Sequence, residues 1–197
     1  MSAHDAVVLA GGAARRLGGA DKPGLEVAGR PLLDRVLEAC EGAVDTVVVG
    51  PRRPTRRPVL WAREDPPGGG PLPALAAGLA RAGSDTVLVF AADMPFLTRT
   101  AADALRESLG READADGVVL TDPSGRDQPL AAAYRTEALR RGLALIATEH
   151  GTLAGLPLRL LTEELRLHRL PDPSGSDSFD CDTWDDVAAA RARLEQG

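Results

Sequence analysis

The sequence predicts an α/β protein: a three-layer, Rossmann-like fold with a mostly parallel, doubly wound sheet. Short apolar runs such as Ala6–Ala10 and Thr86–Ala91 are typical of strands buried on both faces. Segments with helical periodicity alternate with these runs, and such alternation forms parallel sheets with right-handed crossovers. A chain of 197 residues is long enough for one domain of this kind but short for two. We therefore expect a single domain over residues 1–197.

Loops and one amphipathic helix follow the first apolar run. The Ala6–Ala10 strand leads into a polar, glycine-bearing loop that ends at Lys22, and Leu25–Val27 forms a short extended piece. Pro31 then begins a helix that ends at Gly42, because proline is favoured at the first helical position. The apolar residues of this helix recur at helical spacing: Leu32, Leu33, Val36, Leu37 and Cys40.

Two short strands flank a proline-rich segment. They are expected at Val47–Val49 and Val59–Ala62. The prolines of Pro51–Pro58 exclude regular structure between them, because proline lacks an N–H donor and restricts the residue before it. Four arginines lie in this segment: Arg52, Arg53, Arg56 and Arg57. They form either a solvated face or a clamp for an anionic acceptor or partner.

Predicted strands and helices continue to alternate as far as Tyr134, and the pattern is less clear after that residue. We expect, in order, a loop at Asp65–Pro71, a helix at Ala74–Ala82, a strand at Thr86–Ala91, a helix at Thr100–Leu109, a strand at Gly117–Leu120, a turn at Asp122–Gly125 and an apolar run at Pro129–Tyr134. From there to Pro171 the pattern assigns no element. A closing helix spans Trp184–Leu194, with Thr183 as its N-cap and Asp186 completing a capping box.

Composition and charge narrow the classes of function. The net charge of −6 and the pI near 5.1 argue against general nucleic-acid binding. Aromatic residues, at 3%, are too few for a surface that stacks bases. We find no run of 18 apolar residues and no basic leader, so we expect a cytoplasmic protein that does not enter the membrane. Cys40 and Cys181 are expected to be reduced thiols.

A glycine-rich loop with three cations follows the first strand. The segment LAGGAARRLGGADK, Leu9 to Lys22, leaves the strand at the edge where open α/β sheets bind ligands. Four glycines allow backbone N–H groups to approach phosphate oxygens: Gly11, Gly12, Gly18 and Gly19. Three cations can neutralise a triphosphate: Arg15, Arg16 and Lys22. The spacing matches neither the Walker A loop nor the GxGxxG fingerprint, which disfavours an NAD-type binder.

Carboxylates occur at two places suited to a hard cation. Asp93 directly follows the strongest strand, at the same edge as the glycine loop, and Pro95 fixes the turn. Mg²⁺ is commonly held by one or two carboxylates together with substrate phosphates. Asp93 is therefore a candidate metal ligand, and Mg²⁺ is the expected cofactor. Asp180 and Asp182 precede the last helix; one of them reaches the same metal, or Asp182 helps to cap that helix.

Five motifs occur in order along almost the whole chain. They are the LAGGxxRRxGGxDK loop, GRPLLDR at the first helix, GPL at Gly70–Leu72, DMPF at Asp93–Phe96 and QPLAAAY at Gln128–Tyr134. Together they resemble the molybdenum cofactor guanylyltransferases, within the wider group of MobA-like nucleotidyltransferases. Two positions depart from the family pattern. Relatives commonly carry Asn at Gly50, and guanylyltransferases more often carry Asn-x-Asn than Asp-x-Asp at Asp180–Asp182.

The resemblance implies roles for the loop and the strand ends. The nucleotide would meet backbone groups at the start of the loop: Leu9, Ala10, Gly11 and Gly12. Lys22 would bind the phosphates and Asp93 the metal. Base and ribose would lie near Gly50, Asp65 and the Gly70 turn. Asp65 would accept hydrogen bonds from guanine N1–H and N2–H₂, a pairing that rejects adenine, unless it is only a loop residue before proline.

The implied reaction moves GMP from GTP to the terminal phosphate of molybdopterin. Lys22, Asp93 with its metal, and Arg15 or Arg16 would offset the charge that develops at the α-phosphate. Transient contact with molybdoenzymes or cofactor-insertion proteins is also expected. The Gln128–Tyr134 segment either lines the acceptor pocket or packs structurally. The alternatives are CTP-dependent transfer to molybdopterin, transfer to a sugar or alditol phosphate, and a non-catalytic nucleotide-binding or cofactor-delivery module.

Overall fold

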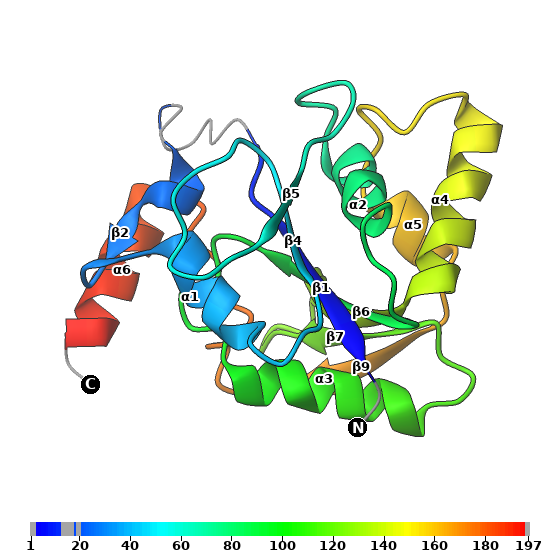
Figure 1. Ribbon diagram of the computed structural model, residues 1–197. Helices are drawn as coiled ribbons and strands as arrows, with labels where there is room; N and C mark the ends of the chain where they lie inside the picture. The colour runs from blue at the N-terminus through cyan, green and yellow to red at the C-terminus, as the bar shows by residue number, and fades with distance from the viewer. Residues whose placement is uncertain (1–2, 13–17, 19–20, 196–197) are drawn as a thin grey trace.

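Apolar runs form the strands of a seven-stranded sheet in the computed structural model, which describes residues 3–12, 18 and 21–195 (Figure 1). The sheet has the order β5-β4-β1-β6-β8-β7-β9. Its strands, in chain order, are β1 His4–Leu9, β4 Thr46–Val49, β5 Leu60–Ala62, β6 Thr86–Ala91, β7 Gly117–Thr121, β8 Asp127–Arg135 and β9 Leu167–Pro171. A separate hairpin pairs β2 Glu26–Val27 with β3 Arg30–Pro31.

All neighbouring strands of the sheet run parallel except at β8. Strand β1 pairs in parallel with β4 on one side and β6 on the other, and β4 pairs in parallel with β5. Strand β8 runs antiparallel to both β6 and β7, while β7 and β9 are parallel. The carboxyl ends of β1, β4, β5 and β6 therefore meet at one edge of the sheet.

Helices cover both faces of the sheet. Their bounds are α1 Leu32–Ala39, α2 Pro71–Leu79, α3 Arg99–Arg111, α4 Thr136–His150, α5 Arg159–Glu163 and α6 Trp184–Glu195, with a short 3₁₀ turn, η2, at Lys22–Gly24. Helices α1 and α3 pack on one face, and α2, α4 and α5 on the other (Figure 1). In β1, Ala6 and Val8 face the first layer while Val7 and Leu9 face the second. This alternation explains why every residue of the strand is apolar from Ala6 onward.

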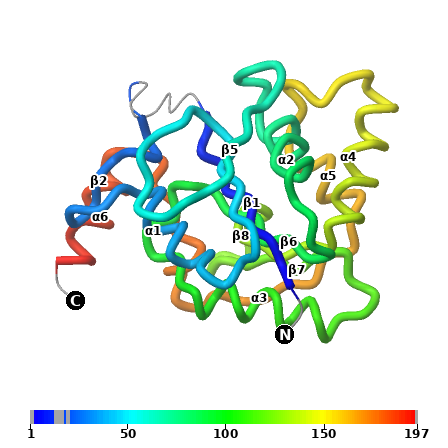
Figure 2. Tube along the Cα trace, viewed as in Figure 1, coloured from blue at the N-terminus to red at the C-terminus, as the bar shows by residue number. Residues whose placement is uncertain are grey.

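A small third hydrophobic core packs the last helix, α6, against β2 and the start of α1. Helix α6 lies beside β2 (Figure 2), and buried residues from both sides join there: Val27, Leu32, Cys181, Val187 and Ala190. Arg193 of α6 stacks over Phe96, 4.0 Å from the ring centroid. The capping box predicted at the helix start is confirmed, because Thr183 N donates to Asp186 over 2.7 Å and Asp186 N donates to Thr183 Oγ1 over 3.2 Å.

The predicted fold class is confirmed, and several element bounds differ. Helix α2 begins at Pro71 and not near Ala74, because prolines are tolerated in a first turn whose N–H groups have no intrahelical partner. Pro31 caps α1 and does not begin it. The part of the chain left unassigned after Tyr134 forms α4, α5 and β9. No helix among the described residues is both long and apolar enough to cross a membrane.

Both cysteines are free and buried. Burial raises the pKa of Cys40, and likewise that of Cys181, to about 12. The free state of both cysteines agrees with the predicted reduced thiols, and the raised pKa values keep them protonated near neutral pH.

Candidate active site at the carboxyl edge

Hydrogen bonds join the ends of the central strands into one rim. Ala10 N donates to Val49 O over 2.8 Å, and Ala92 N donates to Leu9 O over 3.0 Å. Gly50 N donates to Ala62 O over 3.0 Å. The predicted nucleotide contacts at Leu9 and Ala10 thus lie between the residues that end β4 and the residue before Asp93.

Glycine is required at two predicted positions on this rim. Gly50 has φ 149°, and a Cβ there would lie 2.7 Å from the carbonyl oxygen of Ala10. The Asn that relatives commonly carry would not fit this backbone without a shift. Gly70 has φ 97° and caps α2. The end of β4 therefore presents a backbone surface, and no side chain, at the predicted nucleotide contact.

Lys22 joins two of the predicted acidic residues, although they lie far apart in the sequence. Its ammonium group contacts Asp93 Oδ2 and lies 2.7 Å from Asp182 Oδ1. The Lys22 and Asp93 side chains are only 15% and 17% exposed, whereas Asp182 is 46% exposed. Burial lowers the pKa of Lys22, but the two carboxylates outweigh this effect and the pKa lies above its usual value. The lysine is therefore held as a cation.

Asp93 is fixed in place but not fully bonded. Cys181 N donates to Asp93 O over 3.0 Å, which ties the end of β6 to the segment that carries Asp180 and Asp182. The second carboxylate oxygen, Oδ1, is buried and has no hydrogen-bond partner among the described residues. A buried oxygen without a donor costs free energy, and such a group in a native structure calls for an explanation.

Asp180 adds a third carboxylate to this group. Burial, followed by repulsion from Asp182 and Asp93, raises its pKa above the usual value despite the opposing effect of Lys22. Lys22, Asp93, Asp180 and Asp182 are called the acidic cluster below. Arg15 and Arg16, predicted to assist Lys22, lie outside the described residues.

Glu64, which the sequence analysis did not single out, is the neighbour of a residue predicted to contact the base. The predicted guanine reader, Asp65, is exposed. Its neighbour Glu64 lies close to the glycine loop, because a Cβ on Gly11 would be 3.6 Å from Glu64 Oε1. Glu64 accepts a hydrogen bond from Gly68 N over 3.1 Å, while its buried Oε2 has no partner among the described residues. The only sequence signal for Glu64 is its place two residues after the end of β5.

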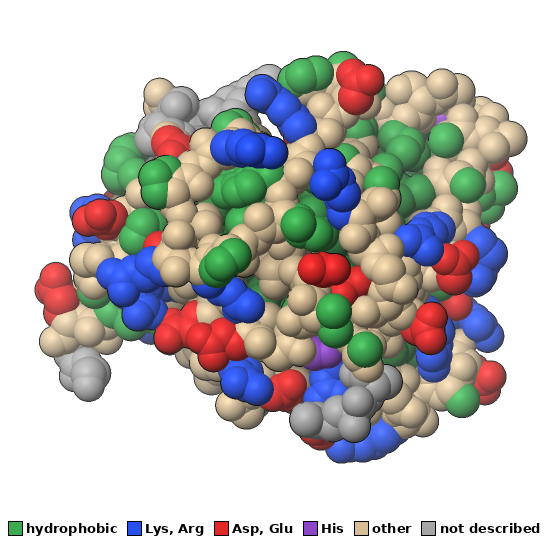
Figure 3. All heavy atoms as spheres, in the orientation of Figure 1, with side chains coloured by type: hydrophobic (Ala, Val, Ile, Leu, Met, Phe, Trp, Pro, Cys, Tyr) green, Lys and Arg blue, Asp and Glu red, His purple; other side chains and the backbone are tan. Residues whose placement is uncertain are grey.

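Three of the four arginines between β4 and β5 are used within the chain. Arg57 donates to Leu37 O over 2.8 Å, Arg53 pairs with Asp21, and Arg56 N donates to Asp34 Oδ1 over 3.1 Å. Figure 3 shows Lys and Arg side chains on the face along which this loop runs. Arg52 instead lines a cavity of about 390 Å³ with Trp61, Arg63 and Arg81. Most of the loop between β4 and β5 is therefore held by contacts with other parts of the chain.

A larger cavity adjoins the acidic cluster on the side of β7 and β8. Its volume is about 460 Å³, and Asp180 and Asp182 form part of its wall. The turn between β7 and β8 supplies Asp122, Pro123, Ser124 and Arg126, and Gln128 of β8 joins them. The rim at the ends of β1, β4 and β5 and this cavity thus lie on opposite sides of Asp93, because those strands flank β6 on one side of the sheet and β8 and β7 flank it on the other.

The donor set suits a hard cation, although no preformed set of ligands is present. Among the described residues, no group of three or more His, Cys, Asp and Glu is arranged to hold a metal ion. Lys22 instead contacts Asp93 and Asp182. The unbonded Asp93 Oδ1 and the raised pKa of Asp180 are what carboxylates short of positive charge would show. The residues therefore fit a divalent cation with oxygen ligands.

Comparison with known proteins places the chain in a family. Residues 6–164 match the MobA-like NTP transferase domain. The probable molybdenum cofactor guanylyltransferase of Natronomonas pharaonis is 30% identical over 206 residues, covering 98% of this chain and all of that protein. The probable molybdenum cofactor guanylyltransferase of Mycobacterium marinum is 39% identical over 160 residues, covering 76% of this chain and 77% of that protein.

A solved structure agrees in fold. Molybdopterin-guanine dinucleotide biosynthesis protein A from Archaeoglobus fulgidus superposes with a TM-score of 0.76 at 23% identity, covering 98% of this chain and all of that one. The family match spans most of the chain, and the relatives align over most of their own length. The chain therefore belongs to the family of MobA-like NTP transferases.

Proposed function

We propose that this protein transfers GMP from GTP to the terminal phosphate of molybdopterin, giving the guanine dinucleotide cofactor and pyrophosphate. The observation that carries the proposal is the acidic cluster, in which Lys22 contacts Asp93 and Asp182 beside the glycine-loop rim. The names of the curated relatives support the choice of substrates. A cytoplasmic location and transient contact with molybdoenzymes or insertion proteins are part of the same proposal.

The nucleotide would lie along the rim formed by the ends of β1, β4 and β5. Backbone groups at the start of the loop would contact it: Leu9, Ala10, Gly11 and Gly12. Gly50 and Gly70 would leave room for ribose and base. Either Asp65 or Glu64 would accept hydrogen bonds from guanine N1–H and N2–H₂; the unbonded Oε2 of Glu64 favours Glu64.

Mg²⁺ would be held by Asp93 together with Asp180 or Asp182. When bound, it would supply positive charge to the phosphate oxygens of the substrate. Lys22 would then leave the carboxylates for the phosphates, which are stronger partners for a compact cation. Lys22 therefore keeps the carboxylates neutralised until the substrate arrives.

The reaction is an in-line displacement at the α-phosphorus of GTP. An oxygen of the acceptor's phosphate forms the new P–O bond, the bond to the bridging oxygen of the β-phosphate breaks, and pyrophosphate leaves with the electron pair. The chain's own residues position the two substrates and offset charge on the phosphates, so no protein nucleophile is needed. The acceptor would occupy the 460 Å³ cavity, which Gln128 helps to line.

A panel of nucleotides tests the proposal. Purified protein, molybdopterin and Mg²⁺ are mixed with GTP, CTP, ATP or UTP, and pyrophosphate release is measured. GTP is expected to give the fastest release, which should cease when molybdopterin is omitted or Mg²⁺ is chelated. Release from CTP alone would instead identify a cytidylyltransferase, and nucleotide binding without release would identify a non-catalytic module.

A further inference from the structure

The cavity beside the acidic cluster carries an unusual set of charges for an anionic substrate. Its wall holds three carboxylates: Asp122, Asp180 and Asp182. Among the described residues that line it, Arg126 alone is a cation. A phosphate monoester carries close to two negative charges near neutral pH. An acceptor of this kind therefore depends on how the carboxylates are neutralised and on Arg126.

Two of the three carboxylates are occupied by other partners. Asp122 Oδ1 accepts from Ser124 N, Ser124 Oγ and Arg126 N over 2.7–3.0 Å, and Asp122 Oδ2 accepts from Gln128 over 3.2 Å. Asp182 contacts Lys22. Asp122 therefore belongs to its own turn, and Asp182 is paired with a cation. The repulsion they would exert on an anion in the cavity is reduced accordingly.

The backbone of Arg126 is held by hydrogen bonds, whereas, in the part of the chain that the structure describes, its guanidinium is not. Its N–H donates to Asp122 Oδ1 over 3.0 Å and its carbonyl accepts from Asp122 N over 3.0 Å, which closes the turn between β7 and β8. Its guanidinium makes no hydrogen bond or ion pair with any described residue. Two arginines on neighbouring strands differ, since Arg135 at the end of β8 donates to Ala115 O and Arg169 of β9 pairs with Asp127. Arg126 is thus a positioned guanidinium with its donors available.

We infer that Arg126 holds the phosphate of the acceptor in this cavity, opposite Lys22, so that the protein selects phosphate monoesters over the corresponding alcohols. The inference rests on the proposed transfer for the identity of the acceptor. A guanidinium donates two parallel N–H hydrogen bonds to one phosphate. These bonds hold the phosphate and also fix the direction in which the remaining phosphate oxygens point. Arg126 therefore positions the attacking oxygen toward the acidic cluster.

The test compares two ligands that differ only in the phosphate. 6-Hydroxymethylpterin phosphate and 6-hydroxymethylpterin are titrated into the full-length protein, and binding is followed by pterin fluorescence without GTP. The wild-type protein should bind the phosphate ester about ten- to a hundredfold more tightly, as expected for charge-assisted hydrogen bonds. Arg126→Gln should reduce this ratio to below threefold and leave the affinity for the alcohol within about twofold.

Matched variants distinguish a specific role of the Arg126 side chain from the effect of changing the net charge of the protein. Arg111→Gln makes the same charge change on α3, where Arg111 pairs with Glu107, and should keep the wild-type ratio. Arg126→Lys should recover part of the preference, because the charge remains while the paired donors are lost. Unchanged melting temperature and unchanged GTP affinity in Arg126→Gln will show that the fold and the nucleotide rim are intact.

The inference and the proposed transfer fail in different experiments. A wild-type protein without preference for the phosphate ester, or an Arg126→Gln variant that keeps a threefold or greater preference, overturns the role of Arg126. Absence of pyrophosphate release from GTP and molybdopterin overturns the proposed transfer, while the binding ratio still decides the role of Arg126.

Discussion

At the start of the parallel strands, Asp5 and Asp116 are surrounded by donors, whereas Asp93 at the strand ends has one buried oxygen with no donor among the described residues. Asp5 accepts from three backbone N–H groups, those of Asp45, Gly83 and Ser84, over 2.7–3.1 Å. Burial acts to raise its pKa, but these hydrogen bonds outweigh it and the pKa is lowered.

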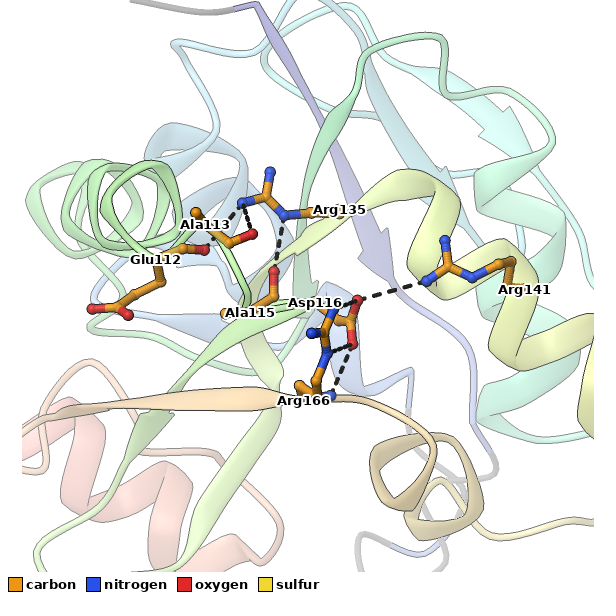
Figure 4. A network of polar contacts seen from close by, with 7 residues as sticks. All are labelled: Glu112, Ala113, Ala115, Asp116, Arg135, Arg141 and Arg166. Atoms are coloured by element: carbon orange, nitrogen blue, oxygen red, sulfur yellow. Dashed lines mark hydrogen bonds and ion pairs between the residues drawn. The ribbon is translucent and has the colours of Figure 1, made fainter.

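Asp116 repeats this pattern at the start of β7. It accepts from Arg166 N over 3.0 Å and from Arg166 Nε over 3.1 Å, and Arg141 lies 3.6 Å away (Figure 4). Beside it, Arg135 donates to the carbonyls of Ala115 and Glu112, in the segment between α3 and β7. Burial raises the pKa of Asp116, but Arg166 outweighs it and the pKa is lowered.

The difference between the two edges is the one expected between structural carboxylates and the proposed functional carboxylates. A structural carboxylate gains stability from being ionised, so its donors are complete and its pKa falls. The carboxylates of the acidic cluster are held close together with too few donors, and the pKa of Asp180 rises. Substitutions should therefore cost activity at the carboxyl edge and stability at the amino edge.

Asp93→Ala should reduce pyrophosphate release by about a thousandfold or more. It removes the proposed ligand of the metal ion whose positive charge would stabilise the transition state. Its melting temperature should stay within a few degrees of the wild type, since Asp93 Oδ1 has no partner among the described residues and Lys22, which loses Oδ2, still pairs with Asp182. Turnover and thermal unfolding are measured on the same preparation. Near-normal activity with Mg²⁺ would remove Asp93 from the metal role.

Lys22→Met should lower turnover by about a hundred- to a thousandfold through loss of charge at the phosphates. The same variant should bind Mn²⁺ more tightly than the wild type in the absence of nucleotide, because no ammonium group competes for Asp93 and Asp182. Electron paramagnetic resonance measures the free Mn²⁺. Weaker Mn²⁺ binding in the variant would contradict the role of Lys22 as a substitute cation.

Asp5→Ala should destabilise the fold by about 3 kcal/mol, since it leaves three backbone N–H groups without their acceptor. Urea unfolding measures the change, and kcat of the folded fraction should not move. Val44→Ala, which truncates an exposed residue in the loop before β4, is the matched control with little expected effect. A loss below 1 kcal/mol would show that these N–H groups find other acceptors.

Asp116→Asn should cost about 1 kcal/mol at neutral pH, because its partner Arg166 is largely exposed and the pair is screened by solvent. The folded-state pKa of Asp116 lies below the usual 3.8. The stability it supplies is therefore fully present above the unfolded-state pKa and is lost as the pH falls through the folded-state pKa. Urea unfolding at several pH values should show the difference between variant and wild type shrinking below about pH 4. A difference that persists at pH 2 would contradict the assignment.

The sequence located the central strands because each is a continuous apolar run bounded by turn residues. Thr86–Ala91 was predicted to the residue, and the strands at Val47 and Val59 to within one or two positions. It did not reveal that β8 runs antiparallel between β6 and β7, since direction depends on which neighbours a strand pairs with. The α4–β9 region had no clear alternation, and tertiary packing determined its helices and strand.

By itself, the sequence determined the chemistry available at the carboxyl edge: a glycine loop after β1, a lysine at its end and an aspartate directly after β6. These follow from local signals, because a strand and the loop that leaves it are neighbours in the chain. Only the tertiary structure decided that Lys22 contacts Asp93 and Asp182, the latter 160 positions away. It also decided that Glu64 faces the glycine loop and that Arg126 borders a cavity next to the acidic cluster. Such contacts depend on how strands are ordered in the sheet, and no local pattern of residues encodes that order.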